Sequence, residues 1–419
     1  MTHKATQHEQ GPAPAAVERT QVLEGASAAI TPAAADPKPA WGAVFALALG
    51  VVGLIASETL PVSLLTPIAK DLGVTQGGAG QAVTATALVA FISSLLIPTL
   101  TWRFNRRHVL LLFAAALVGS NLLAASAPNF PVFLLGRVLL GISLGGFWAM
   151  SAAVAMRLVP GPLVPRALSI IFGGISIASV AAAPLGSYFG AVIGWRGVFL
   201  AAAAVGLLAL VWQAVVLPSM APSGQPRLST LFNLLKRPQV GVGMAGVVLA
   251  FAGHFAFFTY LRPFLETVSH VSVSGLSGIL LAFGAASFAG TSLSGLMLKR
   301  NLRVTLTAMP LVMSLLAAGL VAAGNSQVFA AVFVTLWGFS FAVLPVGWST
   351  WLTRTVPDEA ESGGGLLSAA VQLAITAGAA IGGGIFDHEG AKGAFIVSFV
   401  FLLFAALVTA VGLKPQRGN

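Results

Sequence analysis

The chain alternates between long apolar stretches and short polar segments. From Trp41 onward, runs of eighteen or more mostly apolar residues recur, each bounded by a few charged or turn-forming residues. A helix of that length crosses the ~30 Å of hydrocarbon in a bilayer, and the continuous runs disfavour the alternating pattern of a β-barrel. The pattern predicts twelve transmembrane helices, at residues 41–69, 77–99, 108–127, 130–153, 166–190, 197–217, 240–263, 272–297, 303–323, 327–352, 363–385 and 393–413.

Composition agrees with an all-α membrane protein. Of the 419 residues, 57% are hydrophobic and only 8% are charged, whereas about a quarter of a soluble domain is charged. Residues 1–40 differ: they are rich in Ala and Pro, carry both charge signs and contain no apolar block. We therefore expect a disordered cytoplasmic tail there, and not a signal peptide.

The basic residues between the spans predict the orientation. With the N-terminus inside, fourteen Lys and Arg fall on the inner side and four on the outer side, which is a strong positive-inside bias. Both termini are expected in the cytoplasm of a cell whose inner membrane holds the chain. The inner residues are Arg103, Arg106, Arg107, Arg157, Arg166, Arg227, Lys236, Arg237, Lys299, Arg300, Arg303, Arg354, Lys414 and Arg417; the outer ones are Lys70, Arg196, Arg262 and Lys392.

The longest internal loop divides the spans into two sets of six. We expect six-helix bundles at 41–217 and 240–413, a cytoplasmic linker at 218–239 and a short tail at 414–419. Positions match between the halves at a nearly constant offset: Arg103 with Arg300 (300 − 103 = 197) and Gly141 with Gly338 (338 − 141 = 197). Gly186 and Gly383 share the offset of 197. Two pseudo-symmetric bundles of six helices are typical of a secondary transporter.

Several chemistries are absent from the sequence. There is no cysteine, hence no disulfide or thiolate metal site, and no G-x-x-x-x-G-K-[ST] phosphate loop. No H-E-x-x-H occurs either, and His388 with Glu389 lacks a second histidine. Apart from Arg137, the Lys and Arg residues after the tail lie in or beside the loops and are not clustered on a soluble module, which argues against nucleic acid. We expect no enzyme activity, cofactor or metal, and a monomer in contact with membrane lipid.

Two charges, Glu58 and Arg137, lie deep inside apolar spans, far from the span ends. Counted at about 1.5 Å per residue from the outer ends, Glu58 lies about 16 Å deep and Arg137 about 10 Å. A charge in the membrane faces a cavity or a partner, because its burial in hydrocarbon is costly. Burial favours the neutral form of a carboxyl group, whereas a nearby arginine favours its charged form. Glu58 and Arg137 are therefore candidates for proton coupling. The alternative is a static ion pair that joins the two spans. Pro61 lacks an N–H, so it also leaves the carbonyl of Ser57 without a helical partner.

Further candidates could bind a polar substrate. His254, which lies opposite Glu58 in the repeat (254 − 58 = 196), is the only histidine well inside a span; it serves either as a ligand group or as a structural donor. Gln372 and Thr376, one turn apart, bind either a substrate or neighbouring helices. Aromatic residues on spans four, seven and ten serve for stacking, packing or the interfacial belt, and Tyr260 and Trp348 suit the belt best. These aromatics are Trp148, Phe255, Phe258, Tyr260, Trp337 and Trp348.

The loop "TWRFNRRHV" resembles the G-x-x-x-D-R-x-G-R-R signature of the major facilitator superfamily. Arg103, Arg106 and Arg107 match it, and the resemblance implies a gating loop there. Pro98, Trp102 and Asn105 replace the expected Gly, Asp and Gly. "RVLLG" fits the R-x-x-x-G of span four, which the family links to proton coupling. "APLGS" partly matches the G-P-x-G-G of antiporters, and "GWRGVF" fits a pattern of drug and sugar exporters.

A narrower resemblance covers nearly all of the chain after the tail. The stretches "LPVSLLTP", "LGGFWAMSA", "FAFFTY", "GTSLS" and "PVGWSTW" are similar to purine nucleoside exporters of the superfamily. That resemblance implies export of nucleosides such as inosine and guanosine in exchange for protons. Trp148, Trp337 or Phe258 would stack on the base, and His254 or Gln372 would bind the ribose. The alternatives are a sugar or drug exporter with the same coupling, or an uncoupled channel or scaffold.

Overall fold

The computed structural model describes residues 1–2, 39–160, 163–222, 233–356 and 360–413. The residues from Ala40 onward form one compact unit, and only this unit is considered below. Most of the 1–40 tail, much of the 218–239 linker and the 414–419 tail lie outside the described residues. The helices are α2 (Trp41–Ser63), α3 (Leu65–Leu72), α4 (Gln76–Leu100), α5 (Arg106–Ser126), α6 (Phe130–Leu158), α7 (Val164–Val192), α8 (Gly194–Val216), α10 (Pro238–Thr259), α11 (Leu261–Thr267), α12 (Val273–Ala323), α13 (Gln327–Thr355) and α14 (Ala360–Gly412).

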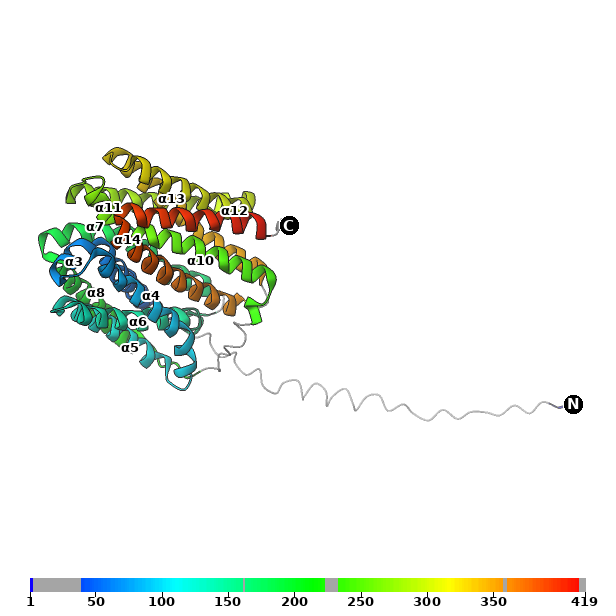
Figure 1. Cartoon of the computed structure of the whole chain (residues 1–419). Coiled ribbons are helices and arrows are strands. Elements are labelled where there is room, and N and C mark those ends of the chain that lie inside the picture. The colour runs from blue at the N-terminus through cyan, green and yellow to red at the C-terminus, as the bar shows by residue number, and fades with distance from the viewer. Residues whose placement is uncertain (3–38, 161–162, 223–232, 357–359, 414–419) are drawn as a thin grey trace. The chain divides into compact units, whose positions relative to one another are not determined.

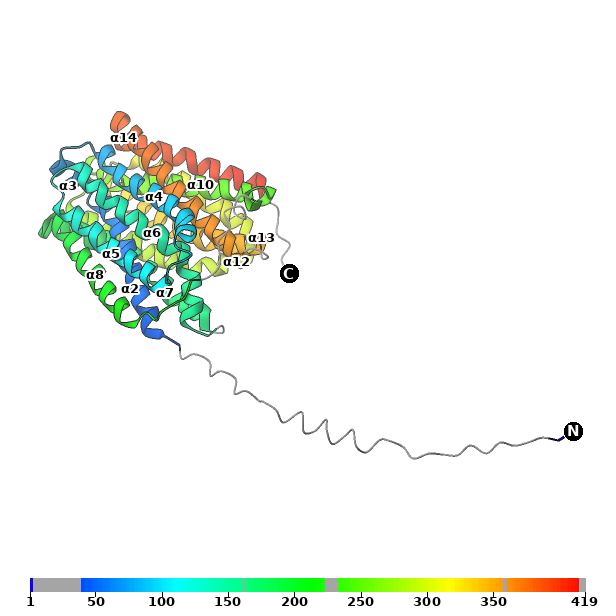
Figure 2. The same cartoon turned by 90° about the horizontal axis from the view of Figure 1, so that it is seen from below.

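Ten of these helices are long and apolar enough to cross a membrane. Two of them, α12 with 51 residues and α14 with 53, are interrupted by non-helical backbone at Asn301 and Gly390. A straight helix of 51 residues would be about 76 Å long, more than twice the hydrocarbon thickness. Each interruption therefore separates two spans, and the described residues form the twelve spans that the sequence predicts. Figure 1 and Figure 2 show the helices of this unit packed against one another.

Two spans end earlier than predicted. The first was expected over 41–69 and the seventh over 240–263, but the helices break at Leu64 and Tyr260. Proline supplies the reason: Pro67 and Pro263 lack the N–H that would continue the helix into the next turn. The breaks differ by 196 positions (260 − 64), and so do the prolines (263 − 67). The internal repeat therefore includes the positions at which the first and seventh spans break.

The helix contacts repeat as well. A Cβ atom on Gly141 would lie 2.6 Å from the carbonyl oxygen of Thr86, and one on Gly338 would lie 2.4 Å from that of Phe283. Both pairs are related by an offset of 197 (338 − 141 and 283 − 86). Such distances are too short for any side chain, so glycine lets α6 approach α4, and α13 approach α12, in the same way.

Arginines at the ends of the spans follow the same symmetry. Arg107 donates from Nη2 to the carbonyl of Ala214 at 2.7 Å, which ties α5 to the end of α8. Arg303 donates in the same way to the carbonyl of Ala410 in α14. Each residue of the second pair lies 196 positions after its counterpart (303 − 107 and 410 − 214). The two six-helix bundles are therefore pseudo-symmetric in detail.

The two halves meet along α4 with α14 and along α7 with α12. A small apolar cluster joins α2, α4 and α14 at this seam, formed by Val62, Val83, Ala87, Ile375 and Ala379. Hydrogen bonds between described residues of the two halves all lie at one end, which the charge count predicts to face outside and which we call the outer end. The donor and acceptor residues are Thr66 with Glu266, Thr75 and Gly77 with Asp387, Arg262 with Ser63, and Tyr260 with Gly77.

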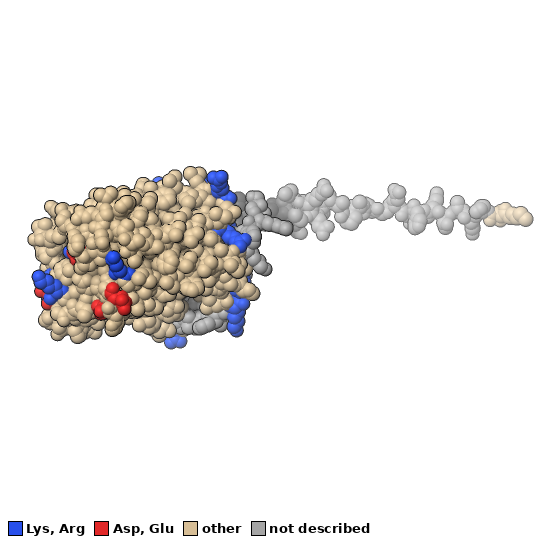
Figure 3. All heavy atoms as spheres, turned by 45° about the horizontal axis from the view of Figure 1, so that its top comes forward, with Lys and Arg blue, Asp and Glu red and all other residues tan. Residues whose placement is uncertain are grey.

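The surface is divided between charge and apolar side chains. On the face shown in Figure 3, Lys, Arg, Asp and Glu lie near the two ends, and a wide band without them lies between. Many large apolar side chains are exposed, such as Leu208 at 65%, Phe288 at 65% and Val215 at 78%. An apolar band between two charged ends is expected of a protein surrounded by lipid.

Loss of the contact at Asp387 should loosen the outer end. Its carboxylate accepts from Thr75 Oγ1 at 2.8 Å and from the backbone N–H of Gly77 at 3.0 Å. Hydrogen bonds to a charged group are worth about 1.5–3 kcal/mol each. Because the chain has no cysteine, Ile375→Cys gives a single reporter at the seam. With Asp387→Ala, its labelling by a membrane-impermeant maleimide from outside should accelerate about tenfold. Glu389→Ala removes a nearby exposed acid as the control; equal acceleration in both variants would contradict the role of Asp387.

Candidate functional site

Arg137 is the centre of a polar network inside the first half. Its side chain is fully buried. Nη2 donates to the carbonyl of Ser57 at 2.8 Å, and Nε donates to Thr86 Oγ1 at 3.3 Å. The Ser57 carbonyl is the one that Pro61 leaves without a helical donor. Arg137 therefore joins α6 to α2 and α4 through a backbone group that the sequence had marked as free.

Glu58 follows Ser57 on α2 but does not bond to Arg137. Its side chain is half-buried, and among the described residues no hydrogen bond or ion pair links it to Arg137. The two groups still interact electrostatically across the site. In this conformation Arg137 joins spans one and four through the Ser57 carbonyl and makes no direct ion pair with Glu58.

Sequence reasoning missed two polar residues of the first half. Asn121 on α5 is fully buried and donates from Nδ2 to Ser57 Oγ at 2.8 Å, so it supports the residue that Arg137 holds. Thr84 on α4 has a buried hydroxyl without a hydrogen-bond partner among the described residues, as does Nη1 of Arg137. The sequence did offer a signal for Asn121, because a polar amide side chain inside an apolar span indicates a buried hydrogen bond. Nothing in the sequence distinguishes Thr84 from other membrane threonines.

The second half places His254 in an aromatic setting. His254 is buried, and its Nδ1 accepts from Trp337 Nε1 at 3.1 Å. The imidazole is stacked on Phe341, with ring centroids 3.4 Å apart, and on Phe258 at 5.3 Å. Trp337 is fully buried and its ring is stacked on Phe257 at 3.7 Å. In this conformation His254 and Trp337 hold each other, and a ligand base could reach the Trp337 face only after Phe257 moves.

The remaining substrate candidates lie in two places. Gln372 is buried with Oε1 unpartnered among the described residues, and Thr376 donates to the Gln372 carbonyl at 2.8 Å. Both belong to the part of α14 that supplies Ile375 to the seam, and Phe258 packs against that seam from α10. Trp148 is half-buried beside Phe147. It lies eleven residues after Arg137 on α6, or about 16 Å further along the helix, so the structure does not bring Trp148 next to the charged pair.

The loop predicted to gate transport is built around Asn105. Its side chain accepts from the backbone N–H of Arg107, which caps α5, and it also binds the segment after α8. Arg106 is buried and donates to the carbonyl and hydroxyl of Thr101. Arg103 is exposed and lies 4.7 Å from the centroid of the Trp102 ring. A tryptophan therefore faces the arginine where the family pattern has an acid.

Tyr260 and Trp348 are not belt residues. Both are fully buried, which contradicts their assignment to the membrane interface. Tyr260 Oη donates to the carbonyl of Ala379 at 2.9 Å and approaches that of Gly77 at 3.5 Å. Position near a span end suggested the belt, but these two rings fill space between helices and, for Tyr260, between the halves.

The twofold set of spans, the buried arginine and the polar groups at the seam define a secondary transporter, and not an enzyme. The sequence model of the Major Facilitator Superfamily matches residues 46–364. The chain belongs to this superfamily. Purine ribonucleoside efflux pump NepI of Salmonella enteritidis and that of Salmonella typhi are each 48% identical to it over 377 residues, which cover 90% of this chain and 95% of each relative.

Solved structures share the fold at low sequence identity. A bacterial homologue of the human lysosomal transporter Spinster has a TM-score of 0.72 at 17% identity, covering 91% of this chain and 99% of its own. A D-xylose-proton symporter has a TM-score of 0.70 at 16% identity, covering 90% of this chain and 99% of its own. These likenesses support the architecture of two six-helix bundles.

The bond between Trp337 and His254 can be tested against a matched tryptophan. Trp337→Phe keeps an aromatic ring on Phe257 but removes the donor to Nδ1. We expect a loss of about 1 kcal/mol of stability for this hydrogen bond, seen as a lower unfolding temperature in detergent. Trp348→Phe is the control, because Trp348 is equally buried but its Nε1 has no partner among the described residues. Equal losses in the two variants would show that the bond contributes nothing.

Proposed function

We propose that this chain exports purine ribonucleosides such as inosine and guanosine in exchange for protons. The observation that carries this proposal is the 48% identity to a purine ribonucleoside efflux pump across 90% of the chain. We place the protein in the cell inner membrane as a monomer. Both termini are assigned to the cytoplasm, and the distribution of basic residues supports this orientation.

Glu58 is the proposed proton carrier. It is the only acidic residue deep in a span, and no described donor occupies its carboxyl group in this conformation. Arg137 is held by Ser57 and Thr86, yet its Nη1 has no hydrogen-bond partner among the described residues. A small movement of α2 would therefore change how strongly the arginine favours the charged carboxyl. That change alternates proton binding and release.

Substrate binding is assigned to the seam between the halves. Val62, one turn after Glu58 on α2, packs in the same apolar cluster as Ile375 of α14. Glu58 and the Gln372–Thr376 segment therefore both lie within about one helical turn of this contact between the halves. Gln372 and His254 supply polar groups for the ribose, while Phe258, Trp148 and Trp337 supply aromatic faces for the base. The hydrogen bonds between the halves at the outer end are what alternating access requires when that end is closed.

The decisive experiment is transport in proteoliposomes. Labelled inosine should be taken up against inosine trapped inside, and an imposed proton gradient should drive accumulation. Uridine, a pentose and a cationic dye serve as competitors. Competition by purine nucleosides alone supports the proposal; equal competition by the sugar or the dye would favour a sugar or drug exporter. An inosine flux that is the same with and without a proton gradient would favour an uncoupled channel.

Glu58→Gln should separate coupling from binding. The amide keeps the shape of the carboxyl but cannot carry a proton, so accumulation driven by the proton gradient should fall at least tenfold. Exchange of labelled for unlabelled inosine should remain. Glu389→Gln, which removes an exposed acid outside the site, should transport like the parent protein. Gradient-driven accumulation at the parent rate in Glu58→Gln would assign a structural role to Glu58.

Trp148→Ala should weaken nucleoside binding. Stacking of a base on an aromatic ring contributes about 1–3 kcal/mol, so the dissociation constant for inosine should rise about tenfold or more. The half-buried position of Trp148 leaves room for this change without the loss of folded protein that Trp337→Ala should cause. Calorimetry on the purified variant measures the constant. An unchanged affinity for inosine would remove Trp148 from the binding site.

A further inference from the structure

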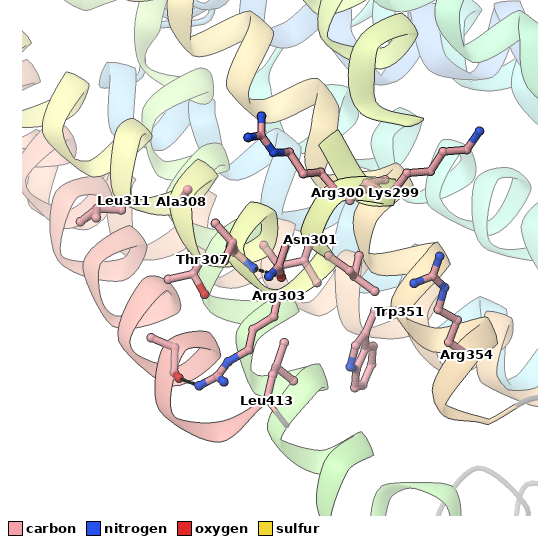
Figure 4. Close-up of a pocket in the computed structure, with 15 residues that line it drawn as sticks. Lys299, Arg300, Asn301, Arg303, Thr307, Ala308, Leu311, Trp351, Arg354 and Leu413 are labelled. Atoms are coloured by element: carbon pink, nitrogen blue, oxygen red, sulfur yellow. Dashed lines mark hydrogen bonds between the residues drawn. The ribbon is translucent and has the colours of Figure 1, made fainter. Parts of the chain in front are cut away.

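A cavity of about 620 Å³ lies in the second half, at the end opposite the outer hydrogen bonds. It surrounds the break of α12 at Asn301 and reaches the ends of α13 and α14 (Figure 4). Its lining includes four cationic side chains and, among the described residues, no acidic one. The four are Lys299, Arg300, Arg303 and Arg354.

Three of these cations have no hydrogen-bond or ion-pair partner among the described residues. Arg303 donates to the carbonyl of Ala410, and Figure 4 shows this bond at the edge of the cavity. Lys299, Arg300 and Arg354 make no hydrogen bond or ion pair with any described residue, and all three are exposed. Concentrated positive charge of this kind repels itself unless an anion is bound.

The first half shows how the corresponding place is filled there. Arg157 and Asn105 are the counterparts of Arg354 and Asn301 (354 − 157 = 197; 301 − 105 = 196). Arg157 donates to the carbonyl of Ala221, and Asn105 accepts from the N–H of Met220 at 3.1 Å. The chain after α8 thus covers this end of the first half and occupies its arginine.

The counterparts in the second half, Asn301 and Arg354, have different hydrogen-bond partners. The side-chain oxygen of Asn301 accepts from the N–H of Val304, at 3.0 Å, and from no other described residue; Arg354 has no acceptor among the described residues either. Within the described part of the chain, the cavity therefore presents hydrogen-bond donors whose counterparts in the first half are bonded to the backbone after α8. A ligand for it must supply acceptor oxygens and negative charge.

The other wall of the cavity is apolar and faces the lipid band. Val304 and Leu311, seven residues apart on one face of α12, are 57% and 40% exposed. Trp351 is buried at the back. We propose that this cavity binds the phosphate headgroup of one anionic phospholipid, with Arg300 and Arg354 on the phosphate and the acyl chains along Val304 and Leu311.

A membrane lipid fits these observations better than a soluble ion does. Free phosphate offers the same oxygens but leaves the exposed apolar stripe uncovered. The sequence after Leu413 is itself basic, with Lys414 and Arg417, so it supplies no side-chain anion for these cations. Charge and apolar surface together select an amphiphile with an anionic head.

Native mass spectrometry of the full chain, with added lipid, tests the proposal. Phosphatidylglycerol should bind as one retained molecule, and phosphatidylcholine should bind at least tenfold more weakly. The double variant Arg300→Gln/Arg354→Gln should weaken binding of phosphatidylglycerol about tenfold or more, because each arginine loses a charge-assisted bond. The matched control is Arg166→Gln/Lys236→Gln, which removes two exposed cations elsewhere at the same end; it should bind like the parent protein.

Each other outcome overturns the proposal. If the control variant bound phosphatidylglycerol as weakly as the double arginine variant, the effect would be due to general surface charge. Displacement of the lipid by millimolar inorganic phosphate or glycerol phosphate would identify a soluble ligand. Binding of phosphatidylglycerol only after truncation behind Leu413 would make the C-terminal residues the occupant. None of these measurements involves nucleoside transport, so the proposal stands or fails independently of the proposed function.

Discussion

A backbone carbonyl that loses its helical donor inside a membrane must find another, because lipid offers none. Pro61 creates such a carbonyl at Ser57, and Arg137 satisfies it at 2.8 Å. This one bond explains why a costly arginine lies fully buried among apolar spans. It also sets the chemistry of the site, since an arginine committed to the backbone does not neutralise Glu58 by direct contact. The carboxyl is near a positive charge and still open to a proton.

The same constraint connects the two halves. Pro67 frees the carbonyl of Ser63, and Arg262 from the second half donates to it. One proline therefore organises the interior of the first bundle and another supplies a contact at the outer end. In a transporter that alternates between states, a contact of this kind can break and reform without unfolding a helix. The pseudo-symmetric break at Tyr260 is followed by a second irregular segment, and this segment contacts the first through Arg262 with Ser63 and Glu266 with Thr66.

The halves share geometry but differ in chemistry. Where the first half has Arg137 and Glu58 between its helices, the second has Trp337 bonded to His254 among stacked rings. A charged network suits proton coupling, and an aromatic one suits a flat ligand. The division places the proposed coupling and much of the proposed recognition on opposite sides of one seam. Relative movement of the bundles then affects both together.

The pattern of apolar runs determined the membrane class and the twelve spans, because span length follows directly from the thickness of a bilayer. Matching residues at a constant offset along the chain determined the repeat. The sequence also marked Glu58, Arg137 and the Ser57 carbonyl, since each is expensive in lipid. Only the tertiary structure decided their pairing: that Arg137 binds the carbonyl and not Glu58, and that Asn121 joins them. Tyr260 and Trp348 show the same limit. Their burial depends on which helix packs opposite them, and no pattern along a single chain records that choice.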